Sequence, residues 1–221
     1  MTDTLIGINF VNTVINNNNI KMGIAERKQR QKEEVREQIL RAAWALVQEE
    51  GWQSLSIRKI ADAIEYSVPV IYSHFENKDA ILQEFTQVGF RELNSALQLA
   101  GTQQENPAEQ LMAMAKAYWH FAFQNKEYYQ LMYGLGMPTC EKVRQVPELG
   151  KYTDLLQGAV KNLIANSKNT QTDPFLKFHT FWSLLHGLVS INMVDQTASP
   201  DNLHELILED AVRGFIKNIQ D

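Results

Sequence analysis

Apolar residues recur along most of this chain at intervals of three and four positions, which is the spacing of one face of a helix. The pattern predicts helices over residues 33–50, 56–64, 67–75, 78–100, 107–123, 126–133, 147–165, 174–194 and 202–219. No stretch shows the convincing alternation of apolar and polar residues that indicates a half-buried strand. Sparse glycine and proline also favour a helical chain over a turn-rich β fold. We therefore expect an all-α protein.

The segment Ser56–Phe75 is predicted to form two short helices joined by a turn at residues 65–67. Ser56 and Ser67 occupy N-cap positions, and Pro69 falls in the first turn of the second helix, where a missing N–H group costs nothing. The residues expected to face inward are Ile57, Ile60, Ala61, Ile64, Ile71, Tyr72 and Phe75. Such a pair forms the helix-turn-helix unit, whose second helix fits the major groove of DNA. On periodicity alone, a plain helical bundle explains the pattern about equally well.

The helices on either side of this pair have the features of a brace and of a mechanical link. The brace at residues 33–50 ends at Gly51, where a left-handed C-cap belongs, and Trp52 is the apolar residue that folds back after such a cap. Asn77 caps the next helix, which runs away from the pair to about Ala100. We expect the first helix to hold the pair rigid and the second to connect it to the rest of the chain.

The outward residues of the pair have side chains suited to DNA. Arginine can donate two hydrogen bonds to guanine O6 and N7, and valine and proline can pack on thymine methyl groups. Hydroxyl groups beside free N–H groups at a helix N-terminus form a site for backbone phosphate. The candidate base-contacting residues are Arg58, Val68, Pro69 and Val70. The candidate phosphate-contacting residues are Ser56, Ser67, Tyr72, His74 and Lys78.

Residues 33–82 together resemble the TetR family of bacterial transcriptional regulators. The family pattern is a bracing helix that ends in Gly, a Ser/Thr-x-Arg-x-Ile-Ala run, and then Leu/Ile-Tyr-x-His-Phe-x-x-Lys. In this chain the three parts are Gly51, Ser56–Ala61 and Ile71–Lys78. The resemblance implies the DNA-contact sets given above. It also implies an all-helical homodimer that pairs through its last two helices and represses transcription until a small molecule binds its C-terminal domain.

Two positions in the turn depart from the family pattern. The family often has Gly where this chain has Glu65. If the backbone there needs a positive φ, the glutamate stores strain of about 1 kcal/mol. Tyr66 replaces a common small apolar residue, so the turn is expected to pack differently. Neither change falls on a predicted phosphate contact.

The resulting prediction is an N-terminal three-helix DNA-binding domain at residues 23–78, followed by a helical ligand-sensing and dimerisation domain at residues 79–221. Residues 1–22 are expected to be a disordered tail or the product of a mis-assigned start, since the sequence from Met22 onward is typical of a cytoplasmic N-terminus. The run Phe181–Gly187 is similar to the Trp…His-Gly signature of one C-terminal subclass of the family.

Large aromatic rings and methionines gather between residues 118 and 137. Singly, each is expected to be a core residue. As a group, they also suit the wall of an apolar pocket for a lipophilic small molecule. The candidate pocket residues are Trp119, Phe123, Tyr129, Met132, Trp182 and His186. His186 is open to two interpretations, a residue that lines the pocket or a hydrogen-bonded core histidine, and the second is favoured.

The formal net charge of −5 is unusual for a DNA-binding protein until it is divided along the chain. Residues 21–79 carry ten basic and ten acidic side chains, whereas residues 80–221 carry 11 basic and 15 acidic ones. Residues 21–41 alone have seven basic and four acidic side chains. A basic N-terminal edge on an acidic body is expected when only one end of a protein touches phosphate.

Composition and motifs argue against other classes of protein. The single Cys140 excludes a disulfide within the chain and fits the cytoplasm, and no signal peptide or membrane-length apolar run occurs. Enzyme and nucleotide-binding motifs are missing, the five histidines lack metal-ligand spacing, and we expect no cofactor or metal.

The function expected is a ligand-responsive repressor that binds a palindromic operator as a homodimer. A transcriptional activator and an architectural DNA-binding factor without a ligand remain open, and a helical enzyme is a remote alternative.

Overall fold

The computed structural model describes residues 23–133, 147–168, 170–194 and 203–221. Within these residues, regular secondary structure is helical throughout, which confirms the all-α prediction. The elements are α1 (Ile24–Glu50), the short 3-10 helix η1 (Trp52–Ser54), α2 (Ile57–Ala63), α3 (Val68–Tyr72), α4 (Lys78–Thr102), α5 (Pro107–Gln124), α6 (Lys126–Tyr133), α8 (Pro147–Ala165), α9 (Pro174–Val194) and α10 (Leu203–Gln220). The predictions for residues 1–22 and Cys140 lie outside the described residues.

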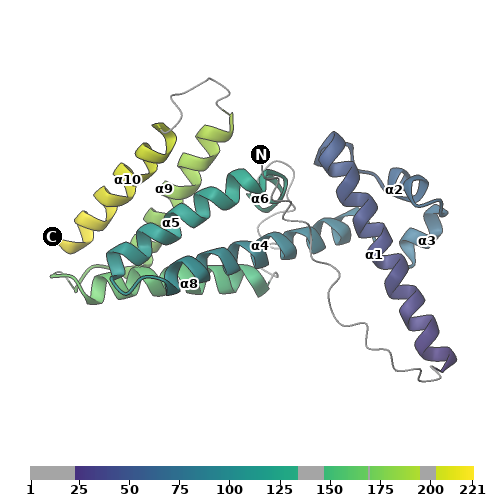
Figure 1. Cartoon of the computed structure of the whole chain (residues 1–221), viewed down its shortest axis with the longest axis horizontal. Coiled ribbons are helices and arrows are strands. Elements are labelled where there is room, and N and C mark those ends of the chain that lie inside the picture. Colours follow the sequence, from purple (N-terminus) through teal and green to yellow (C-terminus); the bar gives the residue numbers. More distant parts are fainter. Residues whose placement is uncertain (1–22, 134–146, 169, 195–202) are drawn as a thin grey trace.

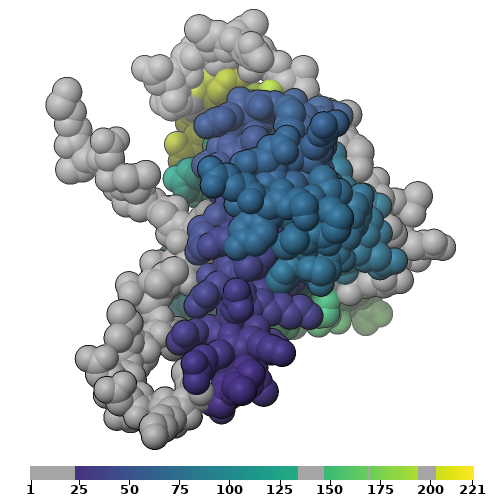
Figure 2. Space-filling view, turned by 90° about the vertical axis from the view of Figure 1, so that its right-hand side faces the viewer, coloured from purple at the N-terminus to yellow at the C-terminus, as the bar shows by residue number. Residues whose placement is uncertain are grey.

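The helices form two parts that share one long helix (Figure 1). We call α1, η1, α2 and α3 the head, and α5, α6, α8, α9 and α10 the body. Helix α4 begins at the head and runs into the body, where it packs against α5, α6 and α8. Helices α9 and α10 pack on each other and on α5 and α8. Seen end-on, the head covers one end of the molecule, with α1 along one side (Figure 2).

Side-chain caps and prolines fix where the long helices begin. Asn77 Oδ1 accepts a hydrogen bond from the Ala80 N–H at 2.9 Å, and Asn106 Oδ1 accepts one from the Ala108 N–H at 2.8 Å. Helices α5, α8 and α9 begin at prolines, whose missing N–H needs no partner in the first turn. Since these signals are local, the predicted bounds of these helices agree with the structure to within about two residues.

Helix α1 begins at Ile24, earlier than the predicted Glu33. Residues 24–34 are exposed all round, so they carry no apolar period from which a helix could be predicted. Their lysines, arginines, glutamines and glutamates are good helix formers, and the buried second half of α1 supplies the nucleus that they extend. The charged first turns of α1 therefore project beyond the head (Figure 1).

The head departs from the prediction in several details. Gly51 has a positive φ of 77°, but its ψ of 169° is extended, so it is not a left-handed helical cap. Helix α3 has five residues, fewer than predicted, because Ser73 and His74 form a hydrogen-bonded turn instead of continuing the helix. Ile57 and Ile64 are half-buried where burial was predicted. Tyr72, predicted to face inward, is 52% exposed.

Candidate DNA-binding surface and the polar interior of the body

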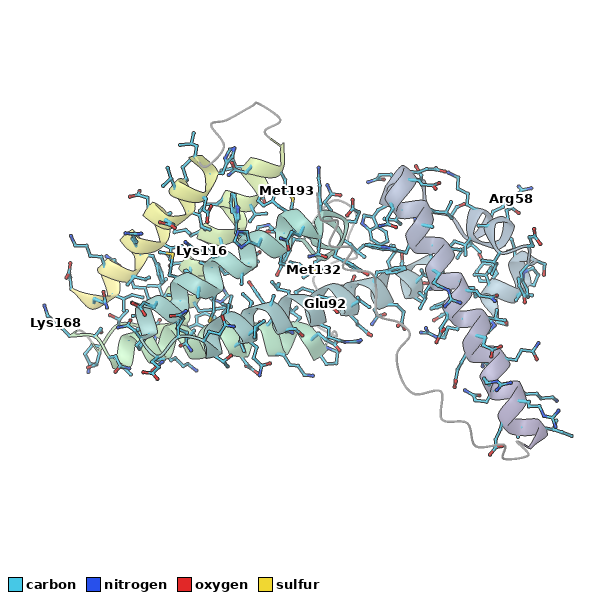
Figure 3. The ribbon with its side chains drawn as sticks, viewed as in Figure 1. Arg58, Glu92, Lys116, Met132, Lys168 and Met193 are labelled. Carbon is cyan, nitrogen blue, oxygen red and sulfur yellow. The ribbon has the colours of Figure 1, made fainter. Side chains whose placement is uncertain are left out.

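Helix α2 is capped by Ser56, whose hydroxyl accepts a hydrogen bond from the Lys59 N–H at 3.2 Å. Arg58 is exposed and lies on the outer side of the head, away from the body (Figure 3). The neighbouring Lys59 forms an ion pair with Glu50 at the end of α1, which ties α2 to the brace. Within the described part of the chain, Arg58 therefore faces solvent without an ion pair, whereas Lys59 has one.

The turn between α2 and α3 closes through the backbone. The Tyr66 N–H donates to the Ala61 carbonyl at 3.0 Å, and the Glu65 N–H donates to the Asp62 carbonyl at 3.3 Å. This pair of bonds is the Schellman motif, which needs a left-handed residue at the position after the cap. Glu65 takes that conformation with a φ of 58°. The strain expected at Glu65 is therefore present, because a side chain occupies a position that suits glycine.

Helix α3 presents a short, mostly apolar edge. Ser67 stands at its N-cap, but the serine side chain makes no capping hydrogen bond, unlike that of Ser56. Pro69 is exposed, whereas Val68 and Val70 are half-buried against the core and offer only their outer edges. The helix ends at Tyr72, and the hydroxyl of the next residue, Ser73, donates to the Val70 carbonyl at 2.7 Å. The free hydroxyl of Ser67 and the ring of Pro69 are thus the more accessible groups at the start of α3.

Among the predicted phosphate contacts, Ser56 and Lys78 are half-buried, and so is His74. Burial lowers its pKa, and the charges of Lys32 and Arg36 lower it further. Its Nδ1 atom is buried without a hydrogen-bond partner among the described residues. At neutral pH the imidazole is therefore uncharged and offers one N–H group. Tyr72, by contrast, reaches solvent from the end of α3.

Four aromatic side chains connect the head to the body, and we call them the joint: Trp44, Trp52, Phe85 and Tyr128. The rings of Trp44 of α1 and Tyr128 of α6 stack with centroids 4.3 Å apart and an interplanar angle of 20°. The Trp52 Nε1–H group donates to the Glu127 carbonyl of α6 at 2.8 Å. Phe85 of α4 contacts both tryptophans. Burial raises the pKa of Tyr128 to about 12, and Glu92 contributes to the same shift.

A second link runs from the head to α4 through Arg36. Its Nη2 atom lies 2.5 Å from Glu84 Oε1, and its guanidinium group lies 4.5 Å from the centre of the Phe75 ring. Arg36 therefore joins α1 to the end of the reading pair and to the start of α4 at once. Both charged side chains are about a third exposed, so the ion pair alone adds little stability.

Inside the body, six polar aromatic side chains from four helices meet. We call them the tyrosine cluster: Tyr118, Tyr129, Tyr133, Tyr152, Trp182 and His186. One side is a hydrogen-bonded chain, with Tyr118 Oη 3.0 Å from Tyr129 Oη and Tyr129 Oη 2.7 Å from His186 Nδ1. The rings of Trp182 and His186 stack at 5.7 Å. Burial lowers the pKa of His186, so the histidine is neutral and belongs to this network.

The six predicted pocket residues do not form one group. Tyr129, Trp182 and His186 meet in the tyrosine cluster. Met132 of α6 packs on α4, where a Cβ atom added at Gly89 would lie 2.6 Å from its Sδ atom. The remaining two form a separate pair: Trp119 and Phe123, with ring centroids 4.6 Å apart. Phe123 is 39% exposed, which places it at the surface of the single chain.

The prediction omitted Tyr118, Tyr133 and Tyr152 from the candidate site. A signal existed, since each lies on a predicted apolar face and a buried phenol needs a hydrogen-bond partner. The described residues also form two hollows elsewhere. One, of about 370 Å³, lies between α4, α5 and α8 near Gly101 and Gly158, and the other, of about 330 Å³, lies beside Arg36 and Glu84.

Comparison with known proteins agrees with this architecture. The family pattern described as bacterial regulatory proteins of the tetR family matches residues 39–92, and that described as the tetracyclin repressor-like C-terminal domain matches residues 111–215. The chain belongs to the TetR family. It is accordingly a DNA-binding transcriptional regulator with a helix-turn-helix head. Among its described residues, no helix is long and apolar enough to cross a membrane, and no three side chains are grouped to hold a metal ion.

Individual relatives are distant. An uncharacterized helix-turn-helix transcriptional regulator from Haemophilus influenzae is 31% identical over 94 residues, which make up 42% of this TetR-family chain and 50% of that protein. The match thus spans half the length of this curated relative. A Rhodococcus protein of unknown function has a TM-score of 0.70 at 21% identity, over 85% of this chain and 96% of its own. A TetR/AcrR-family regulator from Thermobifida fusca has a TM-score of 0.63 at 21% identity, over 83% and 97%. The two structures show a shared fold.

Proposed function

We propose that the protein is a repressor that binds a palindromic operator as a homodimer in the cytoplasm and leaves it when a small molecule binds the body. The observation that carries this proposal is the joint. It packs the DNA-reading head on α6, the same helix that contributes Tyr129 and Tyr133 to the tyrosine cluster. A change in the interior of the body therefore has a short physical route to the head.

In this proposal the head contacts DNA through the residues predicted from the sequence. Arg58 and Pro69 face bases together with the outer edges of Val68 and Val70. The phosphate contacts are Ser56, Ser67, Tyr72, His74 and Lys78. The exposure of Arg58, Pro69 and Tyr72 supports the assignment. His74 takes part as a neutral N–H donor, since its lowered pKa leaves it uncharged.

The homodimer forms through α9 and α10. Both helices leave large apolar side chains exposed on the single chain: Phe175, Leu176, Ile191, Leu203, Leu206 and Ile207. Helix α9 is apolar on more than one side, as a helix must be when it faces both its own core and a partner. A side chain at Gly187 would meet nothing within 4 Å in the single chain, which leaves that position open to a partner helix.

Release from DNA follows from a population shift. The dimer exchanges between two spacings of its heads, and the effector binds one spacing more tightly than the other. Tyr128 and Tyr129 are neighbours on α6, but one contacts Trp44 in the head and the other contacts His186 in the body. A small rotation of α6 would change both contacts together and would move α4 through Met132 and Gly89.

Selection of bound fragments from a random DNA pool, followed by a screen of compounds for release, tests the proposal. We expect a palindromic site whose half-sites lie about one helical turn apart, and a dimer by analytical ultracentrifugation. Failure to select any sequence, or a monomer at micromolar concentration, would contradict it.

Variants of the head test the contact assignment. Lys78→Ala should weaken binding to all sequences and make it less dependent on salt, whereas Arg58→Ala should relax the preference at one base pair by about 1–3 kcal/mol. Lys161→Ala, on the exposed face of α8, is the control and should change neither property. A uniform loss of affinity in Arg58→Ala would reassign Arg58 to phosphate.

A further inference from the structure

Three buried polar atoms of the tyrosine cluster lack a hydrogen-bond partner among the described residues. They are Tyr133 Oη, Tyr152 Oη and Trp182 Nε1. Leaving such a group unpaired in the interior costs about 1–3 kcal/mol. Native proteins keep few such groups, and three in one place call for an explanation. The indole N–H is a donor only, so at least this member needs an acceptor.

The three atoms belong to side chains that lie together. The polar groups of Tyr152, Tyr118 and Trp182 lie near the Tyr133 hydroxyl and affect its pKa, but none meets the geometry of a hydrogen bond to it. Ring contacts place the same side chains together, because Tyr133 lies 5.0 Å from the His186 ring and His186 stacks on Trp182. The group involves α6, α8 and α9, so it exists only in the folded body.

The other side of the cluster is already satisfied. Tyr118, Tyr129 and His186 are joined by hydrogen bonds of 3.0 and 2.7 Å. These bonds hold the Tyr129 ring and the His186 ring in place next to the unpaired atoms. The cluster therefore combines a fixed, hydrogen-bonded wall with neighbouring polar groups that lack partners among the described residues. A few polar groups in an apolar surround are how a small-molecule site fixes the orientation of its ligand.

The surroundings favour an uncharged ligand. Aromatic residues apart, Thr86 is the one fully buried polar or charged residue among those that the structure describes. Its hydroxyl already donates to the Leu82 carbonyl. Burial raises the pKa of Tyr152 well above its usual value, and the neighbouring Tyr133 hydroxyl adds to this shift, so the phenol stays a neutral donor. An anion without a cationic partner would lose several kcal/mol of hydration on entering such a site.

We propose that the tyrosine cluster recognises a flat, uncharged molecule through a carbonyl-type acceptor, such as an aromatic ketone or lactone, that accepts hydrogen bonds from Trp182 and Tyr152. The rings of Phe90, His186 and Trp182 border the same place and suit an aromatic body. This inference rests on the proposed function only in taking the molecule to be the effector.

Isothermal titration calorimetry of the full-length protein with matched probes tests the inference. The probes are coumarin and 1-tetralone, which carry a carbonyl acceptor, naphthalene and tetralin, which do not, and coumarin-3-carboxylate, which is an anion. We expect the two carbonyl compounds to bind more tightly than the other three. Equal binding of hydrocarbon and carbonyl compound, tighter binding of the carboxylate, or no binding of either carbonyl compound would overturn the proposal.

Two variants locate the binding. Tyr152→Phe keeps the ring, and Trp182→Phe reduces the ring volume modestly. Each variant should weaken coumarin binding about three- to tenfold, which is the effect of one hydrogen bond. Tyr128→Phe is the matched control, since Tyr128 is buried and adjacent to Tyr129 but faces the joint. Equal losses in all three variants would mean a general loosening of the body and would contradict a specific site.

A separate measurement distinguishes this inference from the proposed function. Operator binding is followed by fluorescence anisotropy in the presence of coumarin. Calorimetric binding without release of DNA would leave the recognition site standing and would overturn release by the effector. Release by tetralin as effectively as by 1-tetralone would overturn the acceptor chemistry and leave release standing.

Discussion

The head and the body are both built from helices, but their interiors differ in kind. The head closes around apolar side chains, with Ile39, Ile60 and Ile71 fully buried. The body buries Tyr118 as completely as those isoleucines and Tyr152 almost as completely, and three polar atoms of its cluster lack partners among the described residues. Among its described residues, the head has one such atom, His74 Nδ1, at the end of the reading pair, whereas its core gains stability from apolar contacts.

The difference matches the tasks of the two parts. A DNA-reading surface must keep one shape, because a base contact works only within a narrow geometry. A sensing interior must instead become more stable when a ligand binds. Donors that are unpaired in the free protein allow this, because they form hydrogen bonds only with the ligand. The joint lies between the two and combines both kinds of contact, the stacked rings of Trp44 and Tyr128 and the hydrogen bond of Trp52.

The largest effect is expected from the apolar core of the head. Ile71→Ala removes a fully buried side chain from α3 and should destabilise the head by about 2–5 kcal/mol through lost burial and a cavity. Hydrogen exchange of the head amides and operator affinity measure the loss. Ile24→Ala, at a position 73% exposed, is the control and should change neither. A loss below 1 kcal/mol for Ile71→Ala would mean that the head core is not close-packed.

Substitutions in the tyrosine cluster should change stability in opposite directions. Tyr152→Phe removes an unpaired hydroxyl and should raise the free energy of unfolding of the free protein by about 1 kcal/mol. Tyr129→Phe removes a hydroxyl bonded to both Tyr118 and His186 and should lower it by about 1–3 kcal/mol. Urea denaturation monitored by circular dichroism measures both. If both variants are destabilised alike, the body does not differ from an ordinary satisfied core.

A substitution in the joint should have a smaller effect on stability and a larger effect on the coupling between effector binding and release of DNA. Trp52→Phe keeps an aromatic ring but loses the hydrogen bond to the Glu127 carbonyl, which is worth about 1 kcal/mol. Amides of η1 should then exchange faster, and an effector should release less DNA at saturation, while its calorimetric affinity stays unchanged. An unchanged degree of release would remove this bond from the route between the two parts.

The arrangement of helices was largely predictable because its signals are local. Asn77, Asn106 and Asp173 precede the long helices, and each side chain accepts a hydrogen bond from the first turn. The first turns of α1 were missed because residues 24–34 have no buried face and hence no apolar period.

The two candidate sites were predictable from the sequence to different extents. The reading pair occupies one continuous stretch, so its exposed residues could be named from spacing, although Tyr72 was also counted as an inward residue. The tyrosine cluster joins residues from α5, α6, α8 and α9, and periodicity places each on an apolar face without showing which rings meet. The prediction therefore separated Tyr129 from Tyr152 and combined it with Phe123, which lies at the surface.

The turn of the reading pair gives the smallest and most local test. Glu65 has a φ of 58° and stores about 1–2 kcal/mol of strain, part of which a glycine would relieve. The glycine would also make the unfolded chain more flexible, which costs the folded state about 0.5–1 kcal/mol. Glu65→Gly should thus stabilise the head by about 0.5 kcal/mol, measured by hydrogen exchange of the α2 amides. Ala63→Gly, two residues earlier at the end of α2 and in a helical conformation, should destabilise it by about 0.5–1 kcal/mol. If both glycines destabilise the head, the strain at Glu65 is offset by contacts of its own side chain, and the turn is adapted to glutamate.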